Sequence, residues 1–281
     1  MTNTRVGHVC DRCSTAKKIL HVWDQASTAS VIAKWQRRLG HSTAVIKNSK
    51  HDKNKETEYY GGFIIKSKIM FVLKSIFLAR KFDIIHLHDA WFMVIPVKLL
   101  YPKKKIIMHY HGSMIRAKMK ETRRKIWEKY IDQIIVSTPD LLEFEYSKQP
   151  YYIPNPVDTE LFKPIIRPHN YRGLISLKDG QTVKRIEMGL ENNGFDIEVL
   201  TIPRKNRVTY EKFHEKLSNF EFYIDHPFIK GKMIRHHSAC GLQALALGLK
   251  VINWDFDVIV GLPDFHRPEN VVKEIEKIYE I

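Results

Sequence analysis

The chain has 281 residues, 44% of them hydrophobic, and a formal net charge of +15. This length and apolar content exclude an intrinsically disordered protein and fit two domains of about 100–150 residues each. No apolar run reaches the roughly 18 residues of a membrane-spanning helix, and Arg5, Asp11 and Arg12 stand where a signal peptide would be apolar, so we expect a cytoplasmic protein.

Residues 1–17 lack periodicity and are predicted to be an N-terminal extension. They contain the C-x-x-C pair Cys10 and Cys13. A zinc site needs a second ligand pair, which does not follow at a suitable spacing, and a redox pair belongs at a strand-to-helix junction, whereas this one precedes the first strand. Neither function is favoured for these cysteines.

From residue 18, apolar runs of strand length alternate with segments of helical spacing. Before a Pro-rich linker at residues 155–164, we expect strands at 18–23, 43–46, 83–87, 105–109 and 133–136, helices at 27–39, 68–81 and 117–130, and a charged loop at 48–58. After it, we expect strands at 174–177, 196–202, 221–224 and 250–253, and helices at 183–193, 210–217, 238–247 and 268–279.

This alternation predicts an α/β protein with two Rossmann-like domains, each a parallel sheet covered by helices on both faces. The expected boundaries are 18–163 for the first domain and 164–281 for a shorter second domain. Ligands of such sheets bind beyond the carboxyl ends of the strands, so functional residues are expected there.

The positive charge is concentrated in the first domain. Residues 1–163 carry a formal charge of +14, and residues 164–281 carry +1. Basic segments at 68–81, 103–105 and 116–129 suit an anionic membrane surface or a phosphorylated acceptor, although a generally basic proteome or solvated helix faces would give the same pattern. Nucleic acid is a less favoured partner, because no recognised motif or aromatic platform accompanies the charge.

Four segments carry a resemblance to a known family. They are residues 83–91 (DIIHLHDAW), 109–113 (HYHGS), 136–140 (VSTPD) with 153–164 (IPNPVDTELFKP), and 238–248 (SACGLQALALG). In order and spacing they resemble GT-B glycosyltransferases, particularly the retaining enzymes of glycosyltransferase family 4. The last segment resembles the donor-binding helix of that family.

The resemblance implies two domains facing each other across a cleft, with the acceptor on the first and a nucleotide-sugar on the second. It implies transfer of the sugar to a hydroxyl of a glycan or lipid-linked acceptor, with retention of configuration and without a metal or other cofactor. The alternative is a catalytically degenerate scaffold that binds nucleotide, sugar or a partner without turnover.

On the acceptor side, the resemblance implies that His111 contacts the donor sugar, with Gly112 and Ser113 allowing close approach of the backbone. Asp24 follows the first strand and either binds an acceptor hydroxyl or caps the next helix. We also expect Gln25, His88 and Asp89 on this side. His86, His88 and Asp89 have spacing compatible with a metal site, but a structural role lining the cleft is favoured.

On the donor side, the resemblance implies that basic residues hold the diphosphate: Lys178, Lys184 and Arg185. The last two could equally belong to a solvated helix face. The start of the helix at 238–247 would bring backbone N–H groups to the phosphates through Ser238, Cys240, Gly241 and Leu242. Cys240 is expected to be a packing residue. Gln243 would contact the ribose. The two glutamates of the family fall on Arg235 and Gln243, so neither acid is present.

Overall fold

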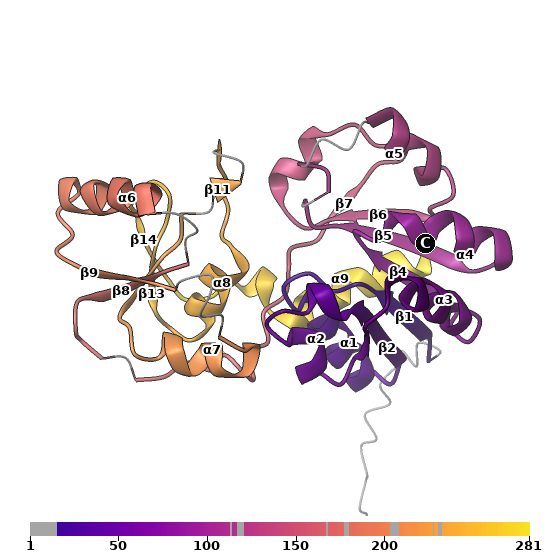
Figure 1. Cartoon of the computed structure of the whole chain (residues 1–281), viewed down its shortest axis with the longest axis horizontal. Coiled ribbons are helices and arrows are strands. Elements are labelled where there is room, and N and C mark those ends of the chain that lie inside the picture. The colour runs from indigo at the N-terminus through magenta and orange to yellow at the C-terminus, as the bar shows by residue number, and fades with distance from the viewer. Residues whose placement is uncertain are drawn as a thin grey trace, which may run out of the picture.

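The computed structural model describes residues 16–112, 114–116, 121–166, 168–176, 180–202, 208–226, 228–229 and 232–281. Within them the chain forms two α/β units side by side (Figure 1), each built around its own mainly parallel sheet. The predicted fold class is therefore confirmed. Cys10 and Cys13 lie outside the described residues.

The first sheet has seven parallel strands in the order β3-β2-β1-β4-β5-β6-β7. Its central strands are almost fully buried, because helices pack on both faces. The strands are β1 (Lys18–Val22), β2 (Ser42–Asn48), β3 (Phe63–Ile65), β4 (Ile84–His88), β5 (Lys105–Tyr110), β6 (Gln133–Val136) and β7 (Tyr151–Tyr152). The sequence predicted the five longest of these strands but not the two short edge strands.

The helices of this unit are α1 (Thr28–Arg38), α2 (Glu56–Tyr59), α3 (Lys68–Ala79), α4 (Val94–Leu100) and α5 (Glu121–Glu128). Helix α2 lies inside the segment that was predicted to be a loop, because one turn is too short to show a helical period. Helix α4 was not predicted either, since it is short and contains a proline. Short 3₁₀ turns occur at Ser49–His51, Trp91–Met93 and Pro139–Glu143.

The second sheet has five strands in the order β14-β13-β10-β8-β9, with only β14 antiparallel. Its strands are β8 (Arg172–Ile175), β9 (Glu198–Thr201), β10 (Phe222–Ile224), β13 (Lys250–Ile252) and β14 (Val258–Val260). The helices are α6 (Gly180–Asn192), α7 (Tyr210–Leu217) and α8 (Ala239–Ala246). A small hairpin, β11 (Phe228–Ile229) with β12 (Lys232–Met233), and a 3₁₀ turn at Asp264–His266 complete this unit.

The last helix, α9 (Pro268–Glu280), crosses back to the first unit and packs against α1 (Figure 1). Val271, Val272 and Ile275 are buried in a core cluster that includes Ile19 and Ile107 of the first sheet. The predicted boundary at residue 164 therefore separates the two sheets, while the last helix of the second segment joins the first core.

Helix α3 buries Phe71, Ser75 and Ala79 and leaves its other apolar stripe exposed. The exposed side chains on α3 and on the neighbouring α4 form one surface, called here the α3–α4 apolar surface: Ile69, Leu73, Phe77, Ile95 and Leu99. Among the described residues, no helix combines the length and the apolar character that crossing a bilayer requires.

Candidate functional site

The carboxyl ends of strands in both sheets lie at the junction of the two units, which is called here the cleft. His111 follows β5, Asn155 follows β7 and Asp225 follows β10. The units touch here, because His266 Nδ1 lies 2.8 Å from the Asn155 carbonyl and His236 Nδ1 lies 3.9 Å from Asp140. This is where ligands of parallel α/β sheets bind, so the cleft is the candidate site.

His111 stands at the floor of the cleft and is half-buried. Its Nε2 lies 3.0 Å from His88 Nδ1, its Nδ1 lies 3.0 Å from Asn155 Oδ1, and its backbone N–H donates to Asp89. Burial lowers the pKa of His111 to about 4, so the ring is neutral at pH 7. The predicted residue is thus at the expected place, with both ring nitrogens turned toward protein groups.

Beside His111, Gly112 has a φ of +85°, and a Cβ at this position would overlap the guanidinium of Arg116. That guanidinium binds both carboxylate oxygens of Asp140 at 2.7 Å and donates to Thr138. Because residue 112 is a glycine, the Arg116 guanidinium can lie directly against the backbone at this position. The sequence placed Arg116 in a basic segment and gave no role to its pairing with Asp140.

Asp24 is 1% exposed, and hydrogen bonds occupy both of its carboxylate oxygens. Oδ1 accepts from the Ala29 N–H at 2.9 Å, and Oδ2 accepts from the hydroxyls of Ser30 and Thr57. Burial raises its pKa, against the opposing effect of Lys47. Of the two roles that the sequence left open, the geometry favours capping of α1.

Gln25 lines a polar cavity of about 280 Å³ beside the cleft, together with Ala26, Lys47, Lys50, His51, Lys53, Asn54 and Glu56. Lys47 is paired with Asp52 and Glu56. The pKa of His51 is lowered, first by burial and then by four lysines around it, which indicates a positive local potential. This cavity is suited to an anionic group.

Helix α8 begins at the opposite wall of the cleft. Ser238 is its N-cap and accepts from the Gly241 N–H at 3.0 Å. Asp225 lies at this helix end and accepts from the Ser238 N–H and from His237 Nδ1, each at 3.0 Å. A Cβ on Gly241 would overlap the Asp225 carboxylate. The predicted anion-binding helix end is present, and a carboxylate of the chain already uses one of its amides.

The other predicted donor-side residues are spread over the second unit. Cys240 is half-buried, and burial raises the pKa of its thiol to about 12, as suits a packing residue. Leu242 and Gln243 are buried within α8. Lys184 and Arg185 are exposed on α6, and Arg235 is exposed 3.4 Å from Asp255. Ser113 and Lys178 lie outside the described residues.

Sequence reasoning missed four polar residues that the fold brings to the cleft: Asn155, Asp225, His236 and His266. His237, which Asp225 orients, was missed as well. One signal was available, because His236 and His237 directly precede the predicted donor helix. The others come from separate loops, and only the packing of the two units places them together.

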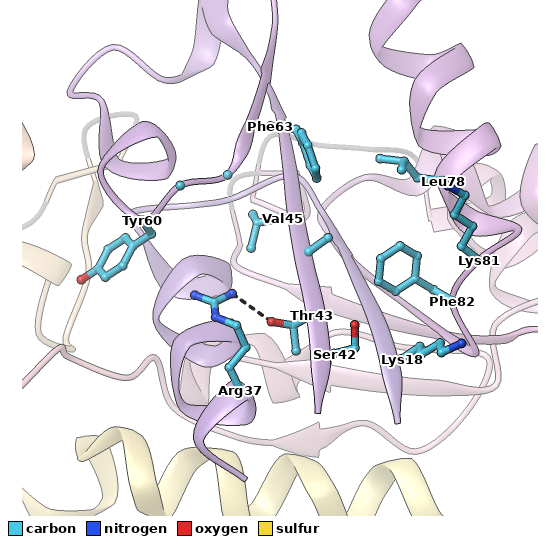
Figure 2. Close-up of a pocket in the computed structure, with 13 residues that line it drawn as sticks. Lys18, Arg37, Ser42, Thr43, Val45, Tyr60, Phe63, Leu78, Lys81 and Phe82 are labelled. Atoms are coloured by element: carbon cyan, nitrogen blue, oxygen red, sulfur yellow. Dashed lines mark hydrogen bonds between the residues drawn. The ribbon is translucent and has the colours of Figure 1, made fainter. Parts of the chain in front are cut away.

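A second cavity, of about 460 Å³, lies at the amino ends of β1 and β2 (Figure 2). Arg37 and Tyr60 stand on one side of it, and Leu78 and Phe82 stand on the other. Arg37 donates to Thr43 at 2.9 Å. The cavity is at the edge of the sheet opposite to the cleft, so it is not part of the candidate site.

Five histidines converge beneath the cleft and are called here the histidine cluster: His21, His86, His88, His109 and His111. His21 lies in β1, His86 and His88 lie in β4, His109 lies in β5 and His111 follows β5, and the first four are fully buried. Two triads within it place one ring nitrogen of each member within 4.8 Å of the others: His21–His86–His88 and His88–His109–His111. Among the described residues, these are the groups that could hold a metal ion.

The chain is similar to known proteins at two levels, a family model and solved structures. Residues 25–161 match the family model described as Glycosyltransferase Family 4. The chain is similar to an α-glucosyltransferase solved with UDP-glucose and DNA containing an abasic site, at 11% identity and a TM-score of 0.56, over 92% of this chain and 89% of that one. It is also similar to MurG of Acinetobacter baumannii, at 12% identity and a TM-score of 0.42, over 93% and 84%. No curated protein matches the sequence significantly.

Proposed function

We propose that this chain, which has the GT-B glycosyltransferase fold and a family 4 match over its first unit, transfers a sugar from a nucleotide-sugar to an acceptor hydroxyl. The family match and the fold support sugar transfer. The observation that carries the proposal is the pairing of the two cleft walls. His111, Gly112 and Arg116 lie beyond the end of β5 in the first unit, His237 and the start of α8 lie beside Asp225 in the second, and the units meet at His236 and Asp140.

In the proposed reaction, the nucleotide-sugar lies across the cleft with its diphosphate near the N-terminus of α8. The helix dipole and the His237 imidazole stabilise charge that develops on the departing diphosphate. Arg116 adds a fixed cation on the facing wall. These groups, with Lys184 and Arg185, are proposed to serve in place of a metal at the diphosphate. The proposed transfer retains the configuration of the sugar.

The proposal predicts nucleotide-sugar turnover that depends on His237. In a panel of UDP-, GDP- and ADP-sugars, at least one donor should be hydrolysed or transferred. His237→Ala should lower kcat/KM for that donor on the order of 10²-fold, because one hydrogen-bonding group at the developing charge is lost. Release of nucleoside diphosphate measures this directly.

The control is His169→Ala, since His169 is an exposed histidine preceding β8 and lies at the opposite end of the second sheet. Its kcat/KM should equal that of the unaltered chain. A panel with neither turnover nor nucleotide binding would remove the proposal.

A second candidate function is a scaffold that binds nucleotide without turnover. It is favoured by the Asp225 carboxylate at the α8 N-terminus, where it would repel a diphosphate, and by Arg235, which points to solvent. Nucleotide binding without turnover, unchanged in His111→Ala, would select the scaffold.

For the acceptor, we propose a lipid-linked substrate with an anionic head group. The basic cavity beside Gln25 offers a site for the head group, and the α3–α4 apolar surface offers contact with the bilayer. Part of the predicted basic face of α5 is not available for this, because Arg124 is buried in an ion pair with Glu128.

This proposal predicts binding to anionic vesicles through α3. Leu73 is 55% exposed and Phe77 is 58% exposed. Replacing both with glutamate should weaken co-sedimentation with phosphatidylglycerol vesicles at least tenfold, since burial of one such side chain contributes about 1.5–3 kcal/mol.

Ile166→Glu is the matched control, because Ile166 is 99% exposed but lies on the connection between the units. It should leave vesicle binding unchanged. Equal losses in both variants, or steeply salt-dependent binding to duplex DNA with no binding to vesicles, would contradict a membrane-bound acceptor.

A further inference from the structure

The histidine cluster contains a triad whose outer nitrogens are all held by hydrogen bonds. In the His21–His86–His88 triad, His21 Nε2 lies 2.8 Å from Gln36 Oε1 and His86 Nδ1 lies 2.6 Å from the Tyr279 hydroxyl. His88 Nδ1 lies 3.0 Å from His111 Nε2. Each ring therefore turns its second nitrogen inward, and the inward nitrogens of His21 and His88 are 3.0 Å apart. This is the support that metal-binding histidines usually have.

The directions of the hydrogen bonds that link His21, His88 and His111 follow from the orientation of the Gln36 amide. Gln36 donates through Nε2 to Glu276, so its Oε1 accepts from His21 Nε2–H, and neutral His21 keeps a lone pair on Nδ1. If His88 donated to that lone pair, His88 Nδ1 would have to accept from His111.

The consequence of this arrangement appears at His111, the last histidine of the series. His111 Nδ1 would be a lone pair facing Asn155 Oδ1 at 3.0 Å, while that oxygen already accepts from Thr28. Two acceptors would then face each other. Reversing the Asn155 amide would also relieve this contact, because its two Nδ2 hydrogens could then reach His111 Nδ1 and the Thr28 hydroxyl oxygen.

A cation between the inward nitrogens removes the conflict. His88 then uses the Nε2 lone pair for the cation and donates from Nδ1 to His111, and His111 donates from Nδ1 to Asn155 Oδ1. His86 Nε2 is the third inward nitrogen, and it is buried with no hydrogen-bond partner among the described residues; it offers a lone pair to a cation when His86 Nδ1–H donates to the Tyr279 hydroxyl. A buried nitrogen without a partner is costly, and a metal ion would satisfy it.

We propose that His21, His86 and His88 bind one divalent transition-metal ion of the zinc class beneath the floor of the cleft. Three imidazoles suit zinc, cobalt, nickel or copper, with metal–nitrogen distances of about 2.0–2.1 Å for zinc. Two nitrogens 3.0 Å apart can share one ion at that distance. The ion fixes the tautomer of His111 and so the direction of its hydrogen bonds with His88 and Asn155.

Burial supports this site. It lowers the pKa of His21 to about 4 and holds the pKa of His86 and of His88 well below the usual value, so all three rings are neutral, the form that binds a metal, at pH 7. All three side chains are fully buried, so the ion would exchange slowly with chelators in the folded protein.

The test is metal binding by the whole chain, which is independent of sugar transfer. The purified protein, unfolded in chelator and refolded, should bind one equivalent of Co²⁺ and give a visible d–d spectrum that Zn²⁺ abolishes. His86→Phe should weaken Co²⁺ binding at least 100-fold. Gln36→Leu, which removes the support of His21, should weaken it by about 10–100-fold.

His109→Phe is the matched control, because His109 is equally buried in the same cluster and belongs only to the other triad. It should keep one equivalent with an unchanged spectrum. Circular dichroism and a thermal melt establish that each variant is folded. Absence of a stoichiometric ion in the unaltered chain would overturn the proposal, and so would loss of the ion in His109→Phe with retention in His86→Phe.

Discussion

Acidification should unfold this protein well before its carboxylates are protonated. Burial lowers the pKa of His111 and of His266 to about 4, whereas an exposed histidine titrates near 6.5. The unfolded chain therefore takes up protons before the folded chain does. Stability from these groups is fully present above pH 6.5 and is lost as the pH falls toward 4.

The size of the loss in stability follows from the same pKa values. Each group whose pKa falls from 6.5 to about 4 contributes on the order of 3 kcal/mol, and His21 shifts in the same direction. Urea unfolding at several pH values should show the free energy of unfolding falling steeply between pH 6.5 and 4. His266→Phe should flatten that slope, while the exposed His169→Ala should not. A free energy that is constant over this range would contradict the burial of neutral histidines.

The second large effect is expected at α9. Ile275 is fully buried between α9 and the first core, in the cluster that holds Ile19 and Ile107. Ile275→Ala should lower the free energy of unfolding by about 2–5 kcal/mol, because it removes buried methyl groups and leaves a cavity. Urea denaturation followed by circular dichroism measures the change.

Ile281→Ala, in the residue that follows the same helix, provides the control, since Ile281 is 66% exposed. Its free energy of unfolding should change by less than about 0.5 kcal/mol. If the two variants lost equal stability, α9 would not contribute to the first core as described.

Strand and helix positions followed closely from local pattern. The strand predicted at 133–136 and the helix at 210–217 coincide with β6 and α7. Each has a hydrophobic period or an apolar run that can be recognised in the sequence. Helix α2 and strands β3 and β7 were missed, because a single helical turn shows no period and these two strands are short and lie at the edges of the sheet.

The residues of the candidate site were likewise only partly predictable from the sequence. The positions of His111 and Gly112 after β5 and of Ser238 at the start of α8 could be predicted from recognisable motifs, while their roles in binding stay predictions. Asp24 could not be assigned from the sequence, since a carboxylate after a strand serves equally as a ligand or as a cap. Its three hydrogen bonds in the fold distinguish the two roles.

By itself, the sequence determined that the chain forms two α/β units with a basic first half, because apolar periodicity and charge are local properties of the chain. Only the tertiary structure showed that α9 joins the first core, that Asp225 lies at the α8 N-terminus, and that five histidines from three strands meet beneath the cleft. Those contacts join residues far apart in the chain, so they depend on how the sheets and helices pack and not on spacing along the sequence.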